Sequence, residues 1–341
     1  MKLTYSREEL LRSHPYVRPH LVGDRPMHGG FDSDGTYHTP RTLNRWPAVE
    51  AWRQSLEDRG GALIDVSSSL LEDDTYPNIA QQELLLREGF GQILWNALTL
   101  TGRNEARAAV LTSMSAPDFA QVVTGDLTQM LTGHLNEGLL EAHGMDEAGD
   151  PATPDLGAHD AMWLAARDLV FGAAAYPTPT PLEGTFKPVR REMPRIPLEH
   201  EHFLKFMMNV LMLELRSQAF FDYCLVLFGD ARNFPGLADE AKQAASIVSR
   251  IATDEIIHIE YLRLLFSELR FTVFRTTDGG EAPGEEIIDP LWTRIVDWHT
   301  ADQRRFASVR RNDVERQLTN GAGAAAASLM ARFDTLADAV T

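Results

Sequence analysis

The sequence predicts an all-α fold in which two pairs of long antiparallel helices form a bundle. Glycine, proline and polar residues at 229–236 interrupt two apolar segments of helical spacing, which indicates a helix pair over 198–270. A hydrophobic helix at 78–100 and a second helix at 117–143, which opens with a proline, supply an upstream pair. The two pairs together are enough to build a bundle around one core.

The remaining segments surround the two helix pairs. A helix at 157–172 precedes a proline-rich stretch at 176–197, which cannot be helical and is expected to run extended as a long crossover. We expect one domain with an irregular N-terminal arm and extra C-terminal helices. Its sections within 1–341 are 1–75 for the arm and a short helix, 76–145 for the first pair, 146–197 for the helix and crossover, 198–270 for the second pair, and 271–341 for the C-terminal appendage.

The length and composition are those of one sizeable domain, and they argue against several kinds of partner and against a disulfide-stabilised fold. Hydrophobic residues make up 44% of the 341 residues, which allows a sizeable core, and the formal charge of -17 argues against nucleic acid or anionic membrane as a partner. The single cysteine, Cys224, excludes a disulfide framework. With neither a signal peptide nor an apolar run of about eighteen residues, the expected location is cytoplasmic.

Three residues of the second pair suggest a metal site. Glu255 and His258 lie three apart on one predicted helix, and Glu214 lies on the preceding helix. At about 1.5 Å per residue, the two glutamates stand about 22 and 28 Å from the connecting loop, within about one turn of each other. Each acid lies within an apolar stripe, where an unpaired carboxylate is costly. The alternative interpretation is an ion pair with Arg216 or Arg250.

In these residues the chain resembles the ferritin-like di-iron carboxylate proteins, which include ribonucleotide reductase small subunits, bacterial monooxygenase hydroxylases and arylamine N-oxygenases. In that superfamily, each of two helix pairs gives one Glu from its first helix and Glu-x-x-His from its second. Glu214, Glu255 and His258 match the C-terminal pair. The resemblance implies a ferritin-like four-helix bundle that holds two iron ions.

The first helix pair should then provide the matching ligands. Glu83 and Glu137 lie at similar heights from the break near Thr101, and Glu88 is the alternative to Glu83. The residue three after Glu137 is Leu140, so the second histidine of the superfamily pattern is missing.

The missing imidazole has several candidate sources. His134 lies one turn before Glu137 on the same predicted face, and we take it as the ligand. By its angle on the helix, His143 projects away from Glu137. Three other residues remain open for this place: His143, His159 and Glu141.

The resemblance implies a non-haem di-iron oxidase or oxygenase. Such a protein uses dioxygen as co-substrate to hydroxylate, N-oxygenate or desaturate a small, partly apolar organic molecule. The implied metal ligands are Glu83, His134, Glu137, Glu214, Glu255 and His258, and the catalytic carboxylates among them are Glu137, Glu214 and Glu255. Manganese is the alternative metal, because carboxylates suit it as well as iron. The electron donor is not identified by the sequence.

Two other functions stay open. A ferritin-like protein could store, oxidise or sense metal without an organic substrate, and a metal-free helical binding protein could carry the same acids as surface charges. The absence of a glycine-rich phosphate loop, a Gly-x-Ser-x-Gly motif and a Cys/His nucleophile arrangement favours the metal interpretation.

Features outside the predicted centre are interpreted as structural. The four histidines of the arm lie in loops without metal-ligand spacing, and a basic cluster in the crossover pairs with acidic surface. The histidines are His14, His20, His28 and His38, and the cluster is Arg190, Arg191 and Arg195. An apolar stripe formed by Leu329, Met330, Phe333 and Leu336 must be covered by the bundle or by a second subunit, so a homodimer is expected to be one way to bury it.

Overall fold

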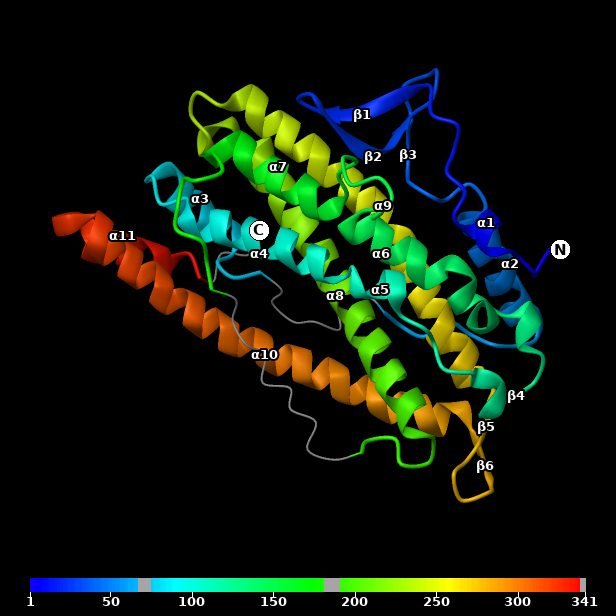
Figure 1. Ribbon diagram of the computed structural model, residues 1–341. Helices are drawn as coiled ribbons and strands as arrows, with labels where there is room; N and C mark the ends of the chain where they lie inside the picture. The colour runs from blue at the N-terminus through cyan, green and yellow to red at the C-terminus, as the bar shows by residue number, and fades with distance from the viewer. Residues whose placement is uncertain (67–74, 181–190, 338–341) are drawn as a thin grey trace.

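The structure is a computed structural model that describes residues 1–66, 75–180 and 191–337 (Figure 1). It is mainly helical, as predicted, and also contains two small antiparallel sheets. The helices are α1 (Arg7–Leu10), α2 (Arg45–Asp58), α3 (Ile79–Arg87), α4 (Gln92–Arg107), α5 (Val110–Ser113), α6 (Leu140–Ala148), α7 (His159–Phe171), α8 (Leu198–Gly229), α9 (Ala238–Phe271), α10 (Gly284–Gly321) and α11 (Ala326–Thr335). The strands are β1 (Arg18–Val22), β2 (Arg25–Phe31), β3 (Tyr37–His38), β4 (Val123–Thr124), β5 (Val273–Arg275) and β6 (Glu281–Pro283).

The long helices α8 and α9 pack against each other along the middle of the molecule (Figure 1). The loop between them turns because the Asp230 side chain accepts a hydrogen bond from the Arg232 backbone and Gly236 adopts a left-handed φ of 82°. This helix pair was predicted at 198–270 and is confirmed. Both of the larger core clusters are built on α8 and α9, so these helices are the frame for everything else.

Helices α4 and α7 complete the helical layer around α9. α4 packs on α7, and α7 packs on α9. Gly102 of α4 permits the close approach, because a Cβ there would lie 3.0 Å from the Asp160 carbonyl oxygen. The helix expected at 157–172 is confirmed as α7. It takes the place in the helical layer that was assigned to 117–143.

The first helix pair differs from the prediction. The helix expected at 78–100 is divided into α3 and α4, with Gly89 at a φ of 84° between them. The helix expected at 117–143 is wrong for most of its length. Short helical turns occupy 119–139, and Glu137 and Gly138 have non-helical backbone angles. Regular helix begins only at Leu140, because Gly138 has a φ of 108° that a helix does not allow.

The two sheets attach peripheral segments to the bundle. Strands β1, β2 and β3 form a hairpin sheet within the N-terminal arm, which was expected to be irregular. Strands β5 and β6 form a hairpin after α9, and β4 adds to its edge. α10 begins at Gly284, and only a glycine fits there, because a Cβ would lie 2.0 Å from the Leu269 carbonyl oxygen.

The C-terminal apolar stripe is covered within the chain. Leu329 and Phe333 are buried in a cluster with residues of α3 and α10, among them Leu85 and Val314. The argument for a homodimer from this stripe therefore loses its basis. Within the described ranges, the search for an apolar helix of bilayer-spanning length found none.

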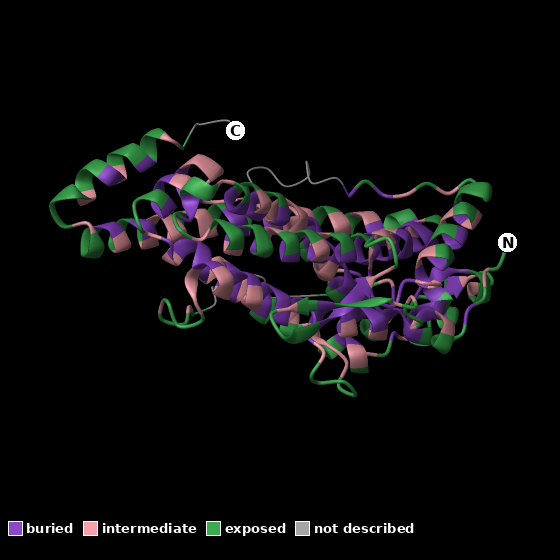
Figure 2. Cartoon of the chain, turned by 90° about the horizontal axis from the view of Figure 1, so that it is seen from above, coloured by how far each residue is buried: buried purple, intermediate pink, exposed green. Residues whose placement is uncertain are grey.

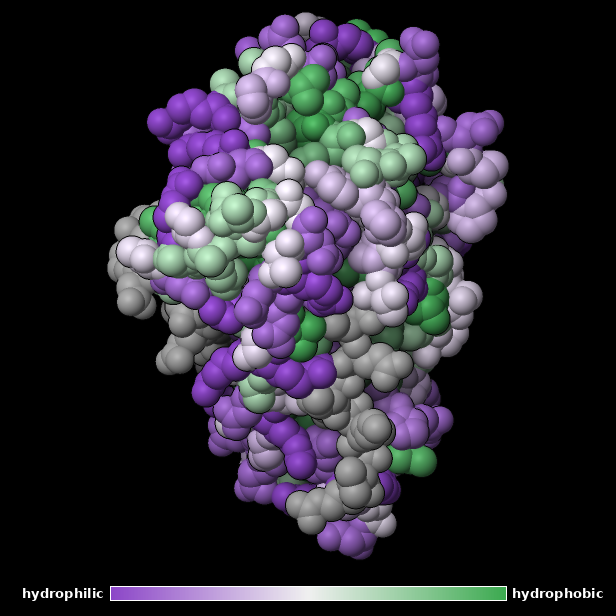
Figure 3. Space-filling view, turned by 90° about the vertical axis from the view of Figure 1, so that its left-hand side faces the viewer, coloured by the Kyte–Doolittle hydropathy of each residue, from purple (hydrophilic) through white to green (hydrophobic). Residues whose placement is uncertain are grey.

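Burial is concentrated where the helices face each other, and the exposed positions lie on the outer faces (Figure 2). The face shown in Figure 3 is largely hydrophilic, with hydrophobic residues gathered toward its upper part. Charged side chains on the exterior are solvated, but charged side chains are also buried in the interior. These buried charges lie between α4, α6, α7, α8 and α9, and they need an explanation.

Candidate metal centre

Acidic and imidazole side chains from five helices meet in the interior of the bundle. Glu105 comes from α4, His143 and Glu147 from α6, His159 from α7, Glu214 from α8, and Glu255 and His258 from α9. All except Glu105, which is half-buried, are at most 8% exposed. Buried charges of this density are costly unless each is paired or bound to a cation.

One group of potential ligand atoms joins α6, α8 and α9. His143, Glu147, Glu214 and His258 each offer an atom within 4.8 Å of the others. His143 Nε2 lies 3.0 Å from Glu214 Oε1, and the rings of His143 and His258 stack with centroids 3.9 Å apart. The other nitrogen of His143, Nδ1, lies 2.7 Å from the Tyr261 hydroxyl, which holds the ring in place.

A second group joins α6, α7 and α9, and it shares a carboxylate with the first. His159 Nδ1 lies 2.9 Å from Glu255 Oε1 and 3.1 Å from Glu147 Oε2. The other oxygens of the same glutamates face His258, whose Nδ1 lies 2.6 Å from Glu255 Oε2 and 2.8 Å from Glu147 Oε1. Each glutamate therefore presents one oxygen to each group, which is the arrangement needed to bridge two cations.

Glu105 reaches the centre from the remaining side. The Trp163 indole donates a hydrogen bond of 3.2 Å to Glu105 Oε1. Burial raises the pKa of the Glu105 carboxyl well above its ordinary value, and the neighbouring charge of Glu147, with which it shares a hydrogen bond, raises it further. Glu105 is thus close enough to Glu147 to act on the same group of atoms.

Two aspartates hold the imidazoles from behind. Asp146 Oδ2 lies 3.1 Å from His258 Nε2, and Asp254 Oδ2 lies 3.4 Å from His159 Nε2. Each aspartate immediately precedes a glutamate of the centre, and each contacts the histidine of another helix. A carboxylate on the far nitrogen fixes the tautomer and leaves the near nitrogen, Nδ1, free to bind a cation.

The N-terminal arm reaches both aspartates. Arg41 and Arg45 form salt bridges with Asp146, and the Arg45 side chain is only 1% exposed. Arg41 has a φ of 52°, a conformation that is uncommon outside glycine and that here aims its guanidinium inward. On the other side, the Tyr37 hydroxyl donates a hydrogen bond of 2.8 Å to Asp254. The arm is therefore part of the site rather than a loose wrapping.

The electrostatics show that the cluster attracts positive charge. Burial raises the pKa of Glu214 well above its ordinary value, with further contributions from Glu255 and Glu147. Burial alone would lower the pKa of His159 and His258, yet the same two glutamates raise it well above the usual range. Glu214 and these two imidazoles thus hold protons more tightly than usual, whereas the neighbouring histidines, against the effect of burial, lower the pKa values of Glu147 and Glu255. Metal cations between these carboxylates would supply the positive charge that the protons otherwise supply.

One unpartnered atom supports a cation here. Glu147 Oε1 is buried without a hydrogen-bond partner, although His258 lies within ion-pair distance. A buried carboxylate oxygen rarely goes unsatisfied, and a metal ion is one of the partners that explains such an exception. Carboxylate and imidazole donors in this proportion fit iron or manganese better than magnesium or calcium, which prefer oxygen ligands alone.

The structure brings Glu214, Glu255 and His258 together, as the sequence predicted. Neither Arg216 nor Arg250 forms the alternative ion pair with these glutamates among the described residues. Arg216 approaches His299, and Arg250 lies over the Phe31 ring.

The ligands proposed for the first helix pair require correction. Glu83 is half-buried and pairs with Arg87 on the same helix, and the alternative, Glu88, pairs with Arg332. Glu137 is exposed, because the backbone leaves helical geometry there and turns the side chain outward.

His134 is buried but occupied elsewhere. Its Nε2 accepts a hydrogen bond from the Tyr5 backbone, its Nδ1 lies 2.8 Å from the Met130 carbonyl oxygen, and its ring packs on Trp52. Glu141 pairs with Arg7 outside the cluster. Of the residues left open for the missing imidazole, His143 and His159 both reach the centre.

Sequence reasoning missed Glu105 and Glu147, and it left His143 and His159 unassigned. One signal was present, because the Asp-Glu pair at 146–147 repeats the Asp-Glu pair at 254–255. Three residues after Glu147, where the superfamily pattern has a histidine, this chain has Asp150, which lies beyond the end of α6. The imidazole comes instead from the first residue of α7.

The basic residues of the crossover are paired where they are described, but three of the four arm histidines, His20, His28 and His38, lie in strands rather than in loops. Arg191 pairs with Glu201 and Arg195 with Glu286, whereas Arg190 lies outside the described residues. His14 and His38 stack on each other away from the centre. His28 is the exception, because its Nε2 lies 3.4 Å from Asp254 Oδ2 behind the site.

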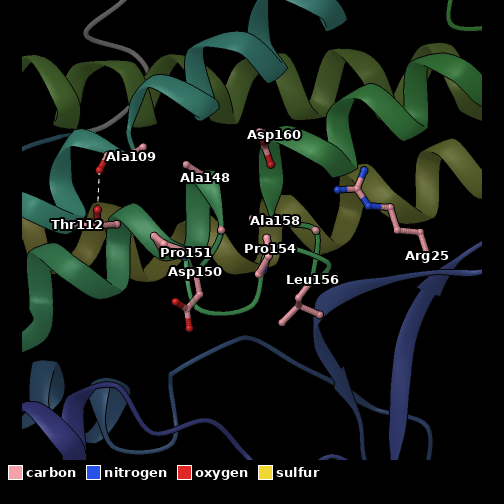
Figure 4. Close-up of a pocket in the computed structure, with 12 residues that line it drawn as sticks. Arg25, Ala109, Thr112, Ala148, Asp150, Pro151, Pro154, Leu156, Ala158 and Asp160 are labelled. Carbon is pink, nitrogen blue, oxygen red and sulfur yellow. Dashed lines mark hydrogen bonds between the residues drawn. The ribbon is translucent and has the colours of Figure 1, made fainter.

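A cavity of about 240 Å³ borders the turn between α6 and α7 (Figure 4). Its wall includes Ala148 and Ala158, the neighbours of Glu147 and His159, together with three charged residues, Arg25, Asp150 and Asp160. The cavity is therefore adjacent to two candidate ligands, and its lining is part charged and part apolar. Comparisons of the chain with protein-family models, curated proteins and solved structures gave no match, so the site's chemistry carries the functional argument.

Proposed function

We propose that the protein is a dinuclear metalloenzyme of the ferritin-like oxidase type, which binds two divalent cations, with iron as the expected metal, and oxidises a small molecule with dioxygen. The observation that carries this proposal is the placement of Glu147 and Glu255. Each directs one oxygen toward His159 and the other toward His258. Paired carboxylates with this geometry suit a pair of cations far better than one.

The charge of the interior supports two cations. The six carboxylates are Glu105, Asp146, Glu147, Glu214, Asp254 and Glu255, and the two guanidinium groups that contact them are Arg41 and Arg45. When all are ionised, the guanidinium groups leave four negative charges uncompensated. Two divalent cations would balance them, which removes the large cost of isolated charge in a medium of low polarity.

The chain's own residues have distinct tasks in this proposal. Glu147 and Glu255 would span the cations, whereas Glu105 and Glu214 would each bind from one side. His143, His159 and His258 would supply neutral nitrogen donors whose orientation Tyr261, Asp254 and Asp146 maintain. When bound, two ferrous ions would each supply one electron to dioxygen. The surrounding helices exclude water from the reacting atoms.

Metal content and reaction with dioxygen test the proposal. Full-length protein prepared without chelator should contain about two iron or manganese ions per chain, and the ferrous form should show a new optical absorption after mixing with dioxygen. Glu255→Gln, which keeps the shape but removes the charge, should lose at least one ion. The matched control is Glu83→Gln in α3, which should keep both. Equal metal content in the two variants would refute the site.

Metal oxidation without an organic substrate is a second candidate. It is favoured by Arg25, Asp150 and Asp160 in the wall of the cavity beside the α6–α7 turn, because charged groups suit an ion better than the apolar part of an organic molecule. Iron oxidation that proceeds at the same rate with and without a panel of small aromatic and aliphatic amines and acids would support it. A substrate-dependent change in the optical transient would support the oxygenase instead.

A further inference from the structure

The two cation positions of the proposed centre offer different donors. The imidazole-rich position consists of His143, Glu147, Glu214 and His258, and the carboxylate-rich position consists of Glu105, Glu147, His159 and Glu255. The first has two imidazole nitrogens, and the second has one. Imidazole favours zinc and iron strongly over manganese, whereas carboxylates discriminate much less between them.

The N-terminal arm increases this difference. Behind the imidazole-rich position, Arg41 and Arg45 bring two positive charges to Asp146. Behind the carboxylate-rich position, Asp254 receives the uncharged phenol of Tyr37. No Arg or Lys among the described residues forms a salt bridge with Asp254, and Arg250 stacks over Phe31 instead. The surroundings are thus net positive on one side and net negative on the other.

The sequence makes specific room for the contact between Tyr37 and Asp254. Gly29 has a φ of 69°, and a Cβ at that position would lie 2.2 Å from the Tyr37 hydroxyl oxygen. Any side chain there would displace the phenol from Asp254. The neighbouring Gly30 accommodates the ring of Tyr16 in the same way. The glycine pair of the arm therefore has a role that its sequence context did not reveal.

We propose that the two cation positions differ in metal preference, with the imidazole-rich position selecting zinc-like or iron-like cations over manganese and the carboxylate-rich position discriminating less. This inference rests on the proposed dinuclear function. The arm supports the difference by neutralising Asp146 with two guanidinium groups while leaving the charge of Asp254 intact. The centre is therefore suited to hold two unlike metals.

Stepwise replacement of manganese by zinc tests this inference on the full-length protein. The chain is first loaded with two equivalents of Mn²⁺ and then titrated with buffered Zn²⁺, and bound metals are counted after each step. The first Zn²⁺ should replace Mn²⁺ at the imidazole-rich position, and the second replacement should need at least about tenfold more free Zn²⁺. Anomalous scattering at the two metal edges assigns each metal to its position.

Variants on each side separate the two positions. His143→Gln should raise the free Zn²⁺ needed for the first replacement by about tenfold or more and leave the second unchanged. Tyr37→Phe removes only the hydroxyl that contacts Asp254, and it should weaken Mn²⁺ binding at the carboxylate-rich position by about tenfold. Tyr16→Phe is the matched control, because its hydroxyl contacts the Thr39 carbonyl oxygen and not Asp254.

The outcomes distinguish this inference from the proposed function. A chain that binds no Mn²⁺ or Zn²⁺ refutes both. Two ions replaced at the same free Zn²⁺ concentration keep the dinuclear centre but overturn the difference between the positions. A third bound equivalent that disappears in His28→Gln also overturns it, because Asp254 would then bind a cation itself with His28 and would not hold His159.

Discussion

The two halves of the centre are built by different kinds of helix. Helices α8 and α9 have 32 and 34 residues, and they carry Glu214, Glu255 and His258 near the middle of their lengths. The other half is assembled from α4, α6 and α7, which have 16, 9 and 13 residues and carry most of their candidate ligands near their ends. The first half is therefore positioned by continuous helices and the second by helix ends.

The difference explains where each imidazole originates. His258 lies one turn after Glu255 on the same helix. After Glu147, the helix ends at Ala148 and Gly149 takes a φ of 87°, so the corresponding place, Asp150, lies outside the helix. His159, at the start of α7, can take the place of that histidine only if the turn between α6 and α7 has a fixed conformation. The second half thus depends more on its surroundings than the first.

Glu147 is the residue whose loss should affect the centre most, because it contacts both groups of ligands. Glu147→Gln is expected to weaken binding of at least one cation by more than about 100-fold, beyond the effect of losing an outer hydrogen bond. Equilibrium dialysis with Mn²⁺ measures it. Glu137→Gln provides the matched control, since that side chain is exposed, and it should bind both cations as the parent does.

Arg45 tests whether the arm stabilises the centre. Arg45→Met removes a buried guanidinium from Asp146 and should lower the free energy of unfolding by about 3–5 kcal/mol, the usual effect of breaking a buried pair. Chemical unfolding of the metal-free protein measures the change. Arg53→Met breaks exposed salt bridges on the same helix and should cost less than about 1 kcal/mol. Similar losses in the two variants would contradict a special role for Arg45.

Glu268 of α9 holds the short helical turn that precedes α6, because its carboxylate accepts hydrogen bonds from the backbones of Leu131 and Thr132. Burial raises its pKa from 4.5 to about 7. The folded state therefore binds more protons than the unfolded state between these values, and stability should fall as pH rises from about 4.5 to 7, by about 3 kcal/mol at most.

Urea unfolding of metal-free protein at pH 5 and pH 8 checks this dependence. The parent should lose more stability between the two pH values than Glu268→Gln, since the variant cannot ionise. An identical pH dependence in both proteins would show that Glu268 does not titrate in this range.

Gly144 tests the smaller effect of packing in the half built from helix ends. A Cβ there would lie 2.7 Å from the Thr112 backbone nitrogen, so Gly144→Ala should cost about 1–3 kcal/mol through overpacking. It should also weaken metal binding, because α6 carries His143 and Glu147. Gly229→Ala in α8 is the control, since no atom lies within 4 Å of its added Cβ and the variant should remain as stable as the parent. Thermal unfolding with and without Mn²⁺ compares them.

The sequence was sufficient for the second helix pair because its information is local. Glu255 and His258 are related by one helical turn, and the loop at 229–236 sets Glu214 opposite them. Helical periodicity and one turn signal therefore predict the three positions. The same reasoning failed for Glu83 and Glu137, because it assumed that 78–100 and 117–143 were each one continuous helix.

By itself, the sequence determined a mainly helical chain, its acidic character and the candidate ligands that share one helical pair, since these follow from composition and from the repeat of the helix. Only the tertiary structure decided that Glu105, His143, Glu147 and His159 join them, and that an arm more than 100 residues away in the sequence secures both aspartates. These contacts depend on where helices end and how their ends are packed. Such placement is fixed by long-range burial of charge and apolar surface, which no local pattern records.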